Sequence, residues 1–231
     1  MPLDAVLFDK DGTLFDFAAT WNSWAGGVIA DLSGGDNGRA QAMAAALEYD
    51  LDRQEFFPAS FVVYATNAEA AAALVPHCEG SSQHELETYL ATRAATAPIS
   101  EVVPLASYMA GLRGDGLKLG VMTNDAELSA HSQLERVGAH NSFDFIAGHD
   151  SGFGAKPDPD PLLAFCKAVN VAPGRCAMVG DSLHDLHAGR AAGMICIGVL
   201  TGTAQAAHLS PHADVVLQDI GEIPAWIAAN R

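Results

Sequence analysis

Short, mostly apolar runs alternate with amphipathic segments along most of the chain. The first run covers residues 5–8, and further runs cover 117–123, 143–148, 176–180 and 195–200. Such runs are typical of strands buried on both faces of a parallel sheet. Helical spacing lies between them, at about 104–113, 126–138, 159–170, 184–192 and 222–230, and 214–217 has the character of an edge strand. This alternation predicts an α/β fold, a doubly wound parallel sheet with a Rossmann-like core.

Residues 16–98 interrupt the alternation. They carry little strand signal and much alanine, and helical character is clearest at 42–47, 68–75 and 85–97. A helical block between the first and second strands of an α/β sheet indicates an inserted domain. We therefore expect an α/β catalytic core formed by residues 1–15 and 99–231, with a helical cap at 16–98 inserted after the first strand.

Composition narrows the range of partners. Among 231 residues, 12 are Lys or Arg and 28 are Asp or Glu, which gives a formal net charge of −16. Such a charge disfavours nucleic acid and anionic membranes, and any anionic substrate would need a local cation. The segment MPLDAVLFDK does not have the pattern of a signal peptide, and no run of about 18 apolar residues predicts a membrane span. The four cysteines form no zinc or disulfide pattern, so we expect a reduced, cytoplasmic protein. We further expect it to be a monomer or homodimer.

Two carboxylates follow the first predicted strand. Asp9 and Asp11 are two residues apart, and Gly12 allows a sharp turn directly after them. In an extended strand both acids would point the same way, toward the edge where α/β sheets bind ligands. Two buried carboxylates require a divalent cation, a shared proton, or both. By the same alternation, the side chain of Lys10 is expected to point away from them.

Two further strand ends supply groups suited to an anion. Thr123 and Asn124 follow the second strand of the core, where a hydroxyl and free backbone N–H groups at a helix start can bind an anion; capping of that helix is the alternative. Lys156, one of only four lysines, lies on a proline-stiffened loop after the next strand and could neutralise an anion. The alternative for Lys156 is an exposed surface lysine.

A second pair of acids follows the strand at 176–180. Asp181 and Asp185 are four residues apart, so one helical turn would bring both carboxylates to one face, with Ser182 between them. Hard oxygen ligands in this arrangement suit Mg²⁺. The alternative is a helix cap with a solvated acid. Phosphoryl transfer needs a nucleophile, a metal, an acid/base and a cation, and four strand ends supply this inventory at one edge.

These motifs, in this order, resemble those of the haloacid dehalogenase superfamily. They are DKDGT at 9–13, TN at 123–124, K-P at 156–157 and GDSLHD at 180–185. The FDKDGTL opening and TND resemble the phosphoglycolate phosphatase-like branch. The resemblance implies a Mg²⁺-dependent phosphatase that hydrolyses a small, phosphoglycolate-like phosphorylated metabolite through an aspartyl-phosphate.

The resemblance also implies roles for single residues. Asp9 would be the nucleophile and Asp11 the general acid/base, oriented by Thr13. The phosphoryl group would be bound by Thr123, by the backbone of Asn124 and by Lys156. The implied Mg²⁺ ligands are Asp9, the backbone carbonyl of Asp11, and Asp181, with Asp185 helping directly or through water. Gly12 and Ser182 would support these loops.

Other activities of this superfamily can be compared with single features of the sequence. Dehalogenases of this superfamily lack an acid at the position of Asp11, and phosphonatases use a cap lysine, whereas residues 16–98 contain no lysine. A sugar-phosphate mutase and a non-catalytic phosphate- or metal-binding regulator remain as alternatives. The carboxylate of phosphoglycolate would need a cation, for which the cap offers Arg39, Arg53 and Arg93. We expect Trp21 and Trp24 to pack within the cap, and His184 to lie on a helix surface.

Overall fold

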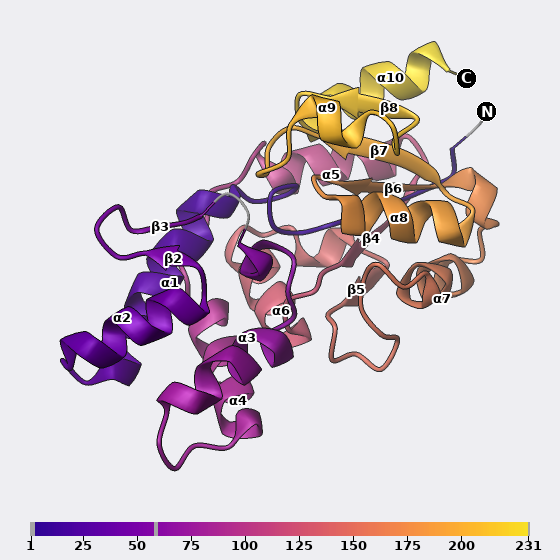
Figure 1. Ribbon diagram of the computed structural model, residues 1–231. Helices are drawn as coiled ribbons and strands as arrows, with labels where there is room; N and C mark the ends of the chain where they lie inside the picture. The colour runs from indigo at the N-terminus through magenta and orange to yellow at the C-terminus, as the bar shows by residue number, and fades with distance from the viewer. Residues whose placement is uncertain (1–2, 58–59, 231) are drawn as a thin grey trace.

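The computed structural model (Figure 1) describes residues 3–57 and 60–230, and its centre is a six-stranded parallel sheet. The strand order is β5-β4-β1-β6-β7-β8. The strands are β1 (Ala5–Phe8), β4 (Lys118–Met122), β5 (Phe145–Ala147), β6 (Cys176–Gly180), β7 (Ile195–Val199) and β8 (Val215–Leu217). Each predicted strand is present with its ends within two residues of those expected, and 214–217 does form an edge.

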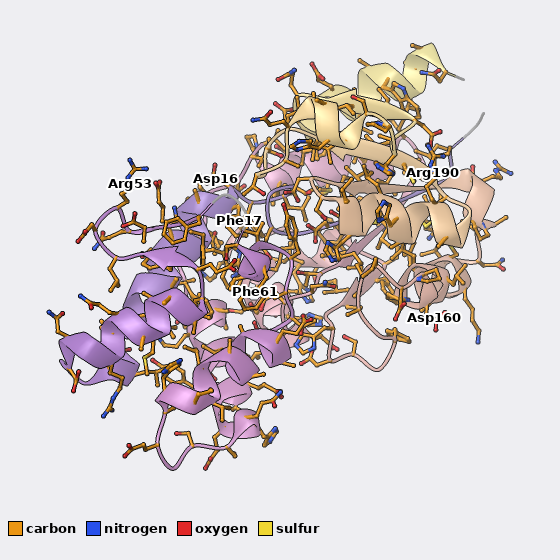
Figure 2. The ribbon with its side chains drawn as sticks, viewed as in Figure 1. Asp16, Phe17, Arg53, Phe61, Asp160 and Arg190 are labelled. Atoms are coloured by element: carbon orange, nitrogen blue, oxygen red, sulfur yellow. The ribbon has the colours of Figure 1, made fainter. Side chains whose placement is uncertain are left out.

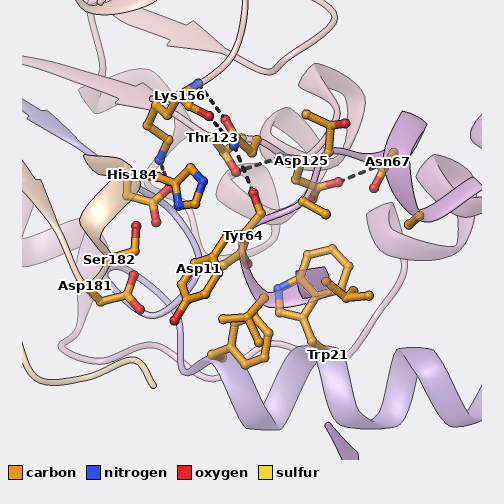
Figure 3. A pocket seen from close by; sticks show the side chains of 18 of the residues that line it. Asp11, Trp21, Tyr64, Asn67, Thr123, Asp125, Lys156, Asp181, Ser182 and His184 are labelled. Atoms are coloured by element: carbon orange, nitrogen blue, oxygen red, sulfur yellow. Dashed lines mark hydrogen bonds and ion pairs between the residues drawn. The ribbon is translucent and has the colours of Figure 1, made fainter. Parts of the chain in front are cut away.

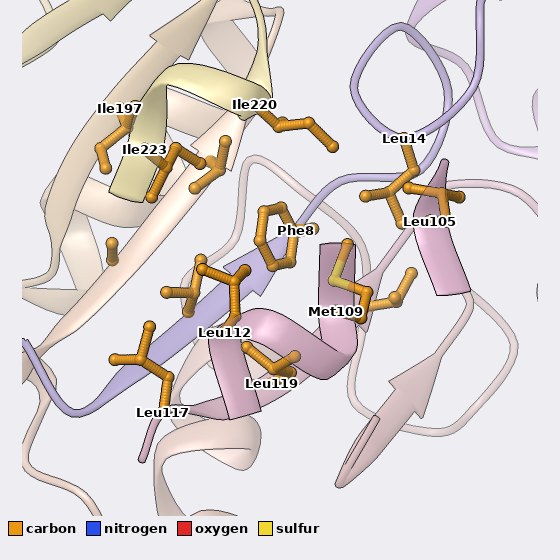
Figure 4. Packing of buried hydrophobic residues seen from close by; sticks show 14 of the residues in the cluster. Phe8, Leu14, Leu105, Met109, Leu112, Leu117, Leu119, Ile197, Ile220 and Ile223 are labelled. Atoms are coloured by element: carbon orange, nitrogen blue, oxygen red, sulfur yellow. The ribbon is translucent and has the colours of Figure 1, made fainter. Parts of the chain in front are cut away.

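Helices cover both faces of this sheet. They are α5 (Leu105–Gly114), α6 (Glu127–Arg136), α7 (Asp160–Val169), α8 (Leu183–Ala192), α9 (Ala206–Leu209) and α10 (Ile223–Ala229), with short 3₁₀ turns at His140–Ser142, Pro173–Arg175 and Ile220–Glu222. Alternation along β1 sends Val6 and Phe8 to the face covered by α5 and α10, as Figure 4 shows for Phe8. Ala5 and Leu7 face α7 and α8. This arrangement confirms the predicted doubly wound α/β fold.

A second set of elements lies between β1 and α5. It comprises α1 (Phe17–Ser33), α2 (Asn37–Ala46), α3 (Asn67–Leu74), α4 (Gln83–Ala95), a small antiparallel pair β2 (Tyr49–Asp50) and β3 (Glu55–Phe56), and 3₁₀ turns at Phe61–Val63 and Val75–His77. These elements share a hydrophobic cluster separate from those of the sheet, built on residues such as Trp24, Val28, Met43, Leu74 and Leu90. In Figure 1 they stand to one side of the sheet, and α4 lies next to α6.

The longest helix of this block, α1, was not predicted. Its sequence contains Gly26 and Gly27, which are poor helix formers, and three aromatic residues. Burial compensates, because Phe17, Trp21, Trp24 and Val28 share one face of the helix and pack into the cluster. Asp16 caps the first turn by accepting a hydrogen bond from the N–H of Ala19. No described helix is both long and apolar enough to cross a membrane.

Candidate active site

The carboxyl ends of β1, β4 and β6 meet at one edge of the sheet. The register pairs Phe8 with both Val121 and Val179, so the residues that follow these strands lie side by side. A pocket at this edge is lined by seven of the ten predicted site residues, as Figure 3 shows in part. They are Asp9, Asp11, Thr123, Asn124, Lys156, Asp181 and Ser182. Gly12, Thr13 and Asp185 lie behind this lining rather than in it.

Lys156 lies between two carboxylates. Its Nζ donates to Asp9 Oδ1 and to Asp185 Oδ1, at 2.6 Å in each case, and the residue is only 5% exposed. Burial lowers the pKa of Lys156, but the Asp185 and Asp9 carboxylates outweigh it and raise the pKa above its usual value. Lys156 is therefore a buried, charged ammonium group, and the alternative of a surface lysine is wrong.

Three carboxylates lie close enough to share one metal ion. Oxygen atoms of Asp9, Asp181 and Asp185 all lie within 4.8 Å of one another, and all three residues are buried. Burial, together with the neighbouring carboxylates, raises the pKa of Asp9 to about 7 and also raises that of Asp181. A site that resists accumulating negative charge, with hard oxygen donors, fits a divalent cation such as Mg²⁺.

The two acids of the second motif meet for a different reason from the one predicted. Asp181 precedes α8 and Asp185 lies inside it, so they do not sit one helical turn apart. Ser182 is the N-cap of α8, and its hydroxyl and N–H donate to Asp185 Oδ2 at 2.6 and 3.1 Å. The alternative of a helix cap with a solvated acid is confirmed in its first part, because Ser182 and Asp185 form a capping box. It is wrong in its second part, because Asp185 is fully buried.

Lys10 contradicts the expectation from strand alternation. Strand β1 ends at Phe8, so the chain turns and the Lys10 side chain bends back toward Asp11, with Nζ to Oδ2 at 2.8 Å. The same Nζ lies 3.1 Å from Asp125 Oδ2 and donates to Gln133 Oε1 at 2.8 Å, and the residue is fully buried. Burial raises the pKa of Asp11 and the Lys10 charge lowers it, with a net rise. Asp9 and Asp11 therefore pair with different lysines, Asp9 with Lys156 and Asp11 with Lys10.

Asp125 is a buried residue that sequence reasoning missed. Besides Lys10, it accepts hydrogen bonds from the hydroxyl of Ser129 and from Nδ2 of Asn67, the latter at 3.2 Å. Its own N–H donates to Thr123 Oγ1 at 3.1 Å, which leaves the Thr123 hydroxyl hydrogen available to donate into the pocket. The motif TND signalled this position, but only the fold reveals its link to Lys10 and to the helical block.

Asn124 holds two loops together. Its Nδ2 donates to the carbonyls of Lys156 and Tyr64, at 2.9 and 3.1 Å, and its Oδ1 accepts from the N–H of Lys156 at 3.0 Å. Neither Thr123 nor Asn124 caps α6, whose N-cap is Ala126, so the capping alternative is wrong. The side chain of Asn124 instead fixes the Lys156 loop against the strand end.

His184 and Thr13 also differ from expectation. His184 is half-buried and lines the pocket, where it stacks on Tyr64 with ring centroids 5.3 Å apart, rather than lying on the helix surface. Burial lowers its pKa, so the ring is neutral near pH 7. The Thr13 hydroxyl is buried and has no described hydrogen-bond partner, so it does not hold Asp11.

Glycines set how closely the loops approach. Gly12 has φ +79°, and a Cβ there would lie 2.6 Å from Asp181, so this position needs glycine on both counts. Gly202, in the loop after β7, was not anticipated: a Cβ there would lie 1.6 Å from Asp181 Oδ2. The neighbouring Thr201 donates from Oγ1 to the Gly12 carbonyl at 2.6 Å. The loop after β7 thus supports both acidic motifs.

Comparisons with known proteins agree with this geometry. A family model for haloacid dehalogenase-like hydrolases matches residues 3–193. The N-acetylmuramic acid 6-phosphate phosphatase of Pseudomonas aeruginosa is 30% identical over 96% of this chain and 94% of its own. The phosphoglycolate phosphatase of Chromobacterium violaceum is 38% identical, over 48% of this chain and 50% of its own.

A solved structure extends the likeness over the whole fold. A hydrolase of the same family from Deinococcus radiodurans, with bound phosphate and sodium, superposes with a TM-score of 0.63 at 26% identity, covering 99% of this chain and 96% of the other. Together with the family match and the phosphatase relatives, it confirms the resemblance stated from the motifs and the prediction of a phosphoric monoester hydrolase.

Proposed function

Because the chain belongs to the haloacid dehalogenase-like hydrolase family, we propose that it is a magnesium-dependent phosphatase that hydrolyses a small phosphorylated metabolite through an aspartyl-phosphate. One observation carries the proposal: Asp9 lies in one pocket with Asp11, 2.6 Å from the Lys156 ammonium and within sharing distance of Asp181 and Asp185. The names of the relatives suggest N-acetylmuramic acid 6-phosphate and phosphoglycolate as the first compounds to test.

Asp9 acts as the nucleophile, and Asp11 transfers the protons. An oxygen of Asp9 attacks phosphorus, and Asp11 gives its proton to the departing ester oxygen. In the second half, Asp11 takes a proton from the water that attacks the aspartyl-phosphate, which releases inorganic phosphate and restores Asp9. Burial raises the pKa of Asp11, which favours the protonated form that the first half requires.

The remaining residues bind and orient the phosphoryl group. The Lys156 ammonium offsets its negative charge, and the Thr123 hydroxyl and the backbone N–H of Asn124 donate hydrogen bonds to its oxygens. Mg²⁺, held by Asp9, Asp181, the Asp11 carbonyl and Asp185, directly or through water, would supply charge neutralisation at the phosphoryl oxygens. Gly12 and Ser182 keep the acidic loops in place.

We assign residues 16–98 the role of a cap over a core of residues 1–15 and 99–231. Support comes from the separate hydrophobic cluster of this block and from two hydrogen bonds at the pocket: Asn67 Nδ2 donates to Asp125, and Asn124 Nδ2 donates to the Tyr64 carbonyl. Closure of such a cap excludes bulk water during attack on phosphorus. We further propose that the protein acts in the cytoplasm, as a monomer or homodimer.

Hydrolysis of p-nitrophenyl phosphate with Mg²⁺ tests the proposal. The purified protein should turn the ester over, chelation of the metal should stop it, and Asp9→Asn should abolish it while the circular dichroism spectrum stays unchanged. Asp160→Asn, an exposed acid at the start of α7 (Figure 2), is the matched control and should keep full activity. Wild-type activity in Asp9→Asn refutes the nucleophile, and no turnover of any phosphate ester favours a non-catalytic regulator.

A further inference from the structure

One wall of the pocket is apolar and aromatic. It consists of Phe17, Trp21 and Trp24 from α1, with Val62 and Val63 from the 3₁₀ turn after the β2–β3 hairpin. The three aromatic residues are 5–8% exposed, and the Trp21 and Trp24 rings meet edge to face at 5.0 Å. The groups proposed to bind the phosphate, Lys156, Thr123 and Asn124, come from loops at the sheet edge, whereas this wall comes from α1 and the 3₁₀ turn. The wall is therefore the part of the lining that is available to the leaving group.

The Trp21 indole N–H is the one side-chain hydrogen-bond donor of this wall without a partner among the described residues. The Trp24 N–H already donates to the carbonyl of Leu90, at 3.4 Å. The Trp21 nitrogen is buried and makes no hydrogen bond, and Figure 3 draws it on the side of the ring nearer Asp11. The N–H is directed toward Asp11 but does not meet the distance and angle of a hydrogen bond to it. A buried donor without a partner calls for an acceptor from the ligand.

The pocket offers no cation to a second anionic group. Lys156 is the only Lys or Arg among its described lining residues, and Asp9 and Asp185 already pair with it. Lys10, 5.4 Å from the centre of the Trp21 ring, is enclosed by Asp11, Asp125 and Gln133 and does not line the pocket.

The cap arginines do not supply the missing charge either. Arg39 and Arg93 are exposed, and Arg93 pairs with Asp31 at 3.1 Å. The side chain of Arg53 is 75% exposed beside Glu55, and in Figure 2 it projects from the outer end of the β2–β3 loop. None of the three lines the pocket. A carboxylate close to the phosphate would therefore be buried among Asp11, Asp125 and Asp181 without a partner, which is strongly unfavourable.

We infer that the leaving group is a neutral sugar, whose C–H face packs on the Phe17–Trp21–Trp24 wall and whose oxygen accepts a hydrogen bond from Trp21 Nε1. The inference rests on the proposed phosphatase function and names its substrate class. Apolar ring faces suit this wall, and a hydroxyl or ring oxygen satisfies the buried donor without adding charge. A leaving group with a carboxylate, such as that of phosphoglycolate, is disfavoured, and so is an acidic sugar such as N-acetylmuramic acid.

Three phosphate monoesters separate the contributions: glucose 6-phosphate, n-propyl phosphate and 2-phosphoglycolate, each with saturating Mg²⁺. For the wild-type protein, kcat/KM should be highest for glucose 6-phosphate and at least about tenfold lower for 2-phosphoglycolate, because its carboxylate has no partner. Trp21→Phe keeps the aromatic ring and removes the N–H. It should lower kcat/KM for glucose 6-phosphate by roughly three- to tenfold, the value of one neutral hydrogen bond. The loss on n-propyl phosphate, which has no second oxygen to accept this hydrogen bond, should be clearly smaller.

The controls make each outcome decisive. Trp226→Phe, in α10 and outside the pocket, should change none of the three values. Preference of the wild-type protein for 2-phosphoglycolate overturns the inference. An equal loss of kcat/KM for glucose 6-phosphate and n-propyl phosphate in Trp21→Phe also overturns it, because the N–H would then act through Asp11. The wild-type ranking stands even if the variant does not fold. No turnover of any ester overturns the phosphatase proposal itself.

Discussion

Replacing Lys10 by methionine should destabilise the protein more than any exposed substitution. Lys10 is fully buried, and its ammonium lies 2.8 Å from Asp11 and 3.1 Å from Asp125. Methionine keeps most of the length of the side chain but removes the charge and the donors. Two carboxylates and the Gln133 oxygen then lose their shared partner inside the protein.

The expected cost follows from burial. Removing one partner of a buried ion pair costs about 3–5 kcal/mol, because the remaining charge is left without compensation. For a protein of this length, 1 kcal/mol shifts the melting temperature by roughly 2–4 °C, so the melting temperature of Lys10→Met should fall by roughly 6–20 °C. Total stabilities are only about 5–15 kcal/mol, so the loss is a large share of the whole.

Thermal unfolding followed by circular dichroism measures this effect, and Lys118→Met is its matched control. Lys118 is half-exposed and 3.6 Å from Asp144, a surface pair worth about 0–1 kcal/mol. Its melting temperature should therefore change by no more than roughly 4 °C. If Lys10→Met melts within this range of the wild type, the buried pair does not hold the two acids, and the reasoning is wrong.

Two further predictions concern the metal site. Burial raises the pKa of Asp9 to about 7, so without metal the folded protein binds more protons than the unfolded chain between about pH 4 and 7, and stability falls as pH rises through this window. In EDTA the melting temperature should rise as pH is lowered from about 8 to about 6, and a profile of Asp9→Asn that is equally steep would contradict the assignment. An alanine Cβ at Gly202 would lie 1.6 Å from Asp181, so Gly202→Ala should raise the Mg²⁺ concentration for half-maximal activity by roughly tenfold or more. Gly111→Ala, with open space around it, is the control, and an unchanged Mg²⁺ requirement in Gly202→Ala would show that Asp181 is not a ligand.

The parts of the fold that could be predicted are those with a local cause. A buried parallel strand has to be apolar on both faces, so runs such as 5–8 and 176–180 can be recognised as strands from the sequence alone. Acids placed directly after these strands then meet at one edge of the sheet. Helix α1 lacks such a local cause. Its glycines weaken the helical pattern, and what stabilises it is packing against residues such as Met43 and Leu90, far away in the chain.

The site was less predictable where it depends on contacts between distant segments. The orientation of Lys10 changes with the exact end of β1, since a single residue of strand more or less reverses the side that a side chain faces. Its partners Asp125 and Gln133 come from α6 and the loop before it, and no spacing in the sequence links them to residue 10. The same holds for Asn67, which contacts Asp125, and for His184, which stacks on Tyr64, because both contacts join residues far apart in the chain.

The two buried lysines account for how an acidic protein can accept a phosphate. Five carboxylates lie in or directly behind the pocket, those of Asp9, Asp11, Asp125, Asp181 and Asp185, and two ammonium groups oppose them. With all five ionised, three negative charges stay without compensation, and a phosphate dianion would be repelled. A divalent cation cancels two of the three, and a proton on Asp11 cancels the last. Under the proposed function, the charge is balanced only when a divalent cation is bound and Asp11 is protonated, which is the same state that the proposed first chemical step needs.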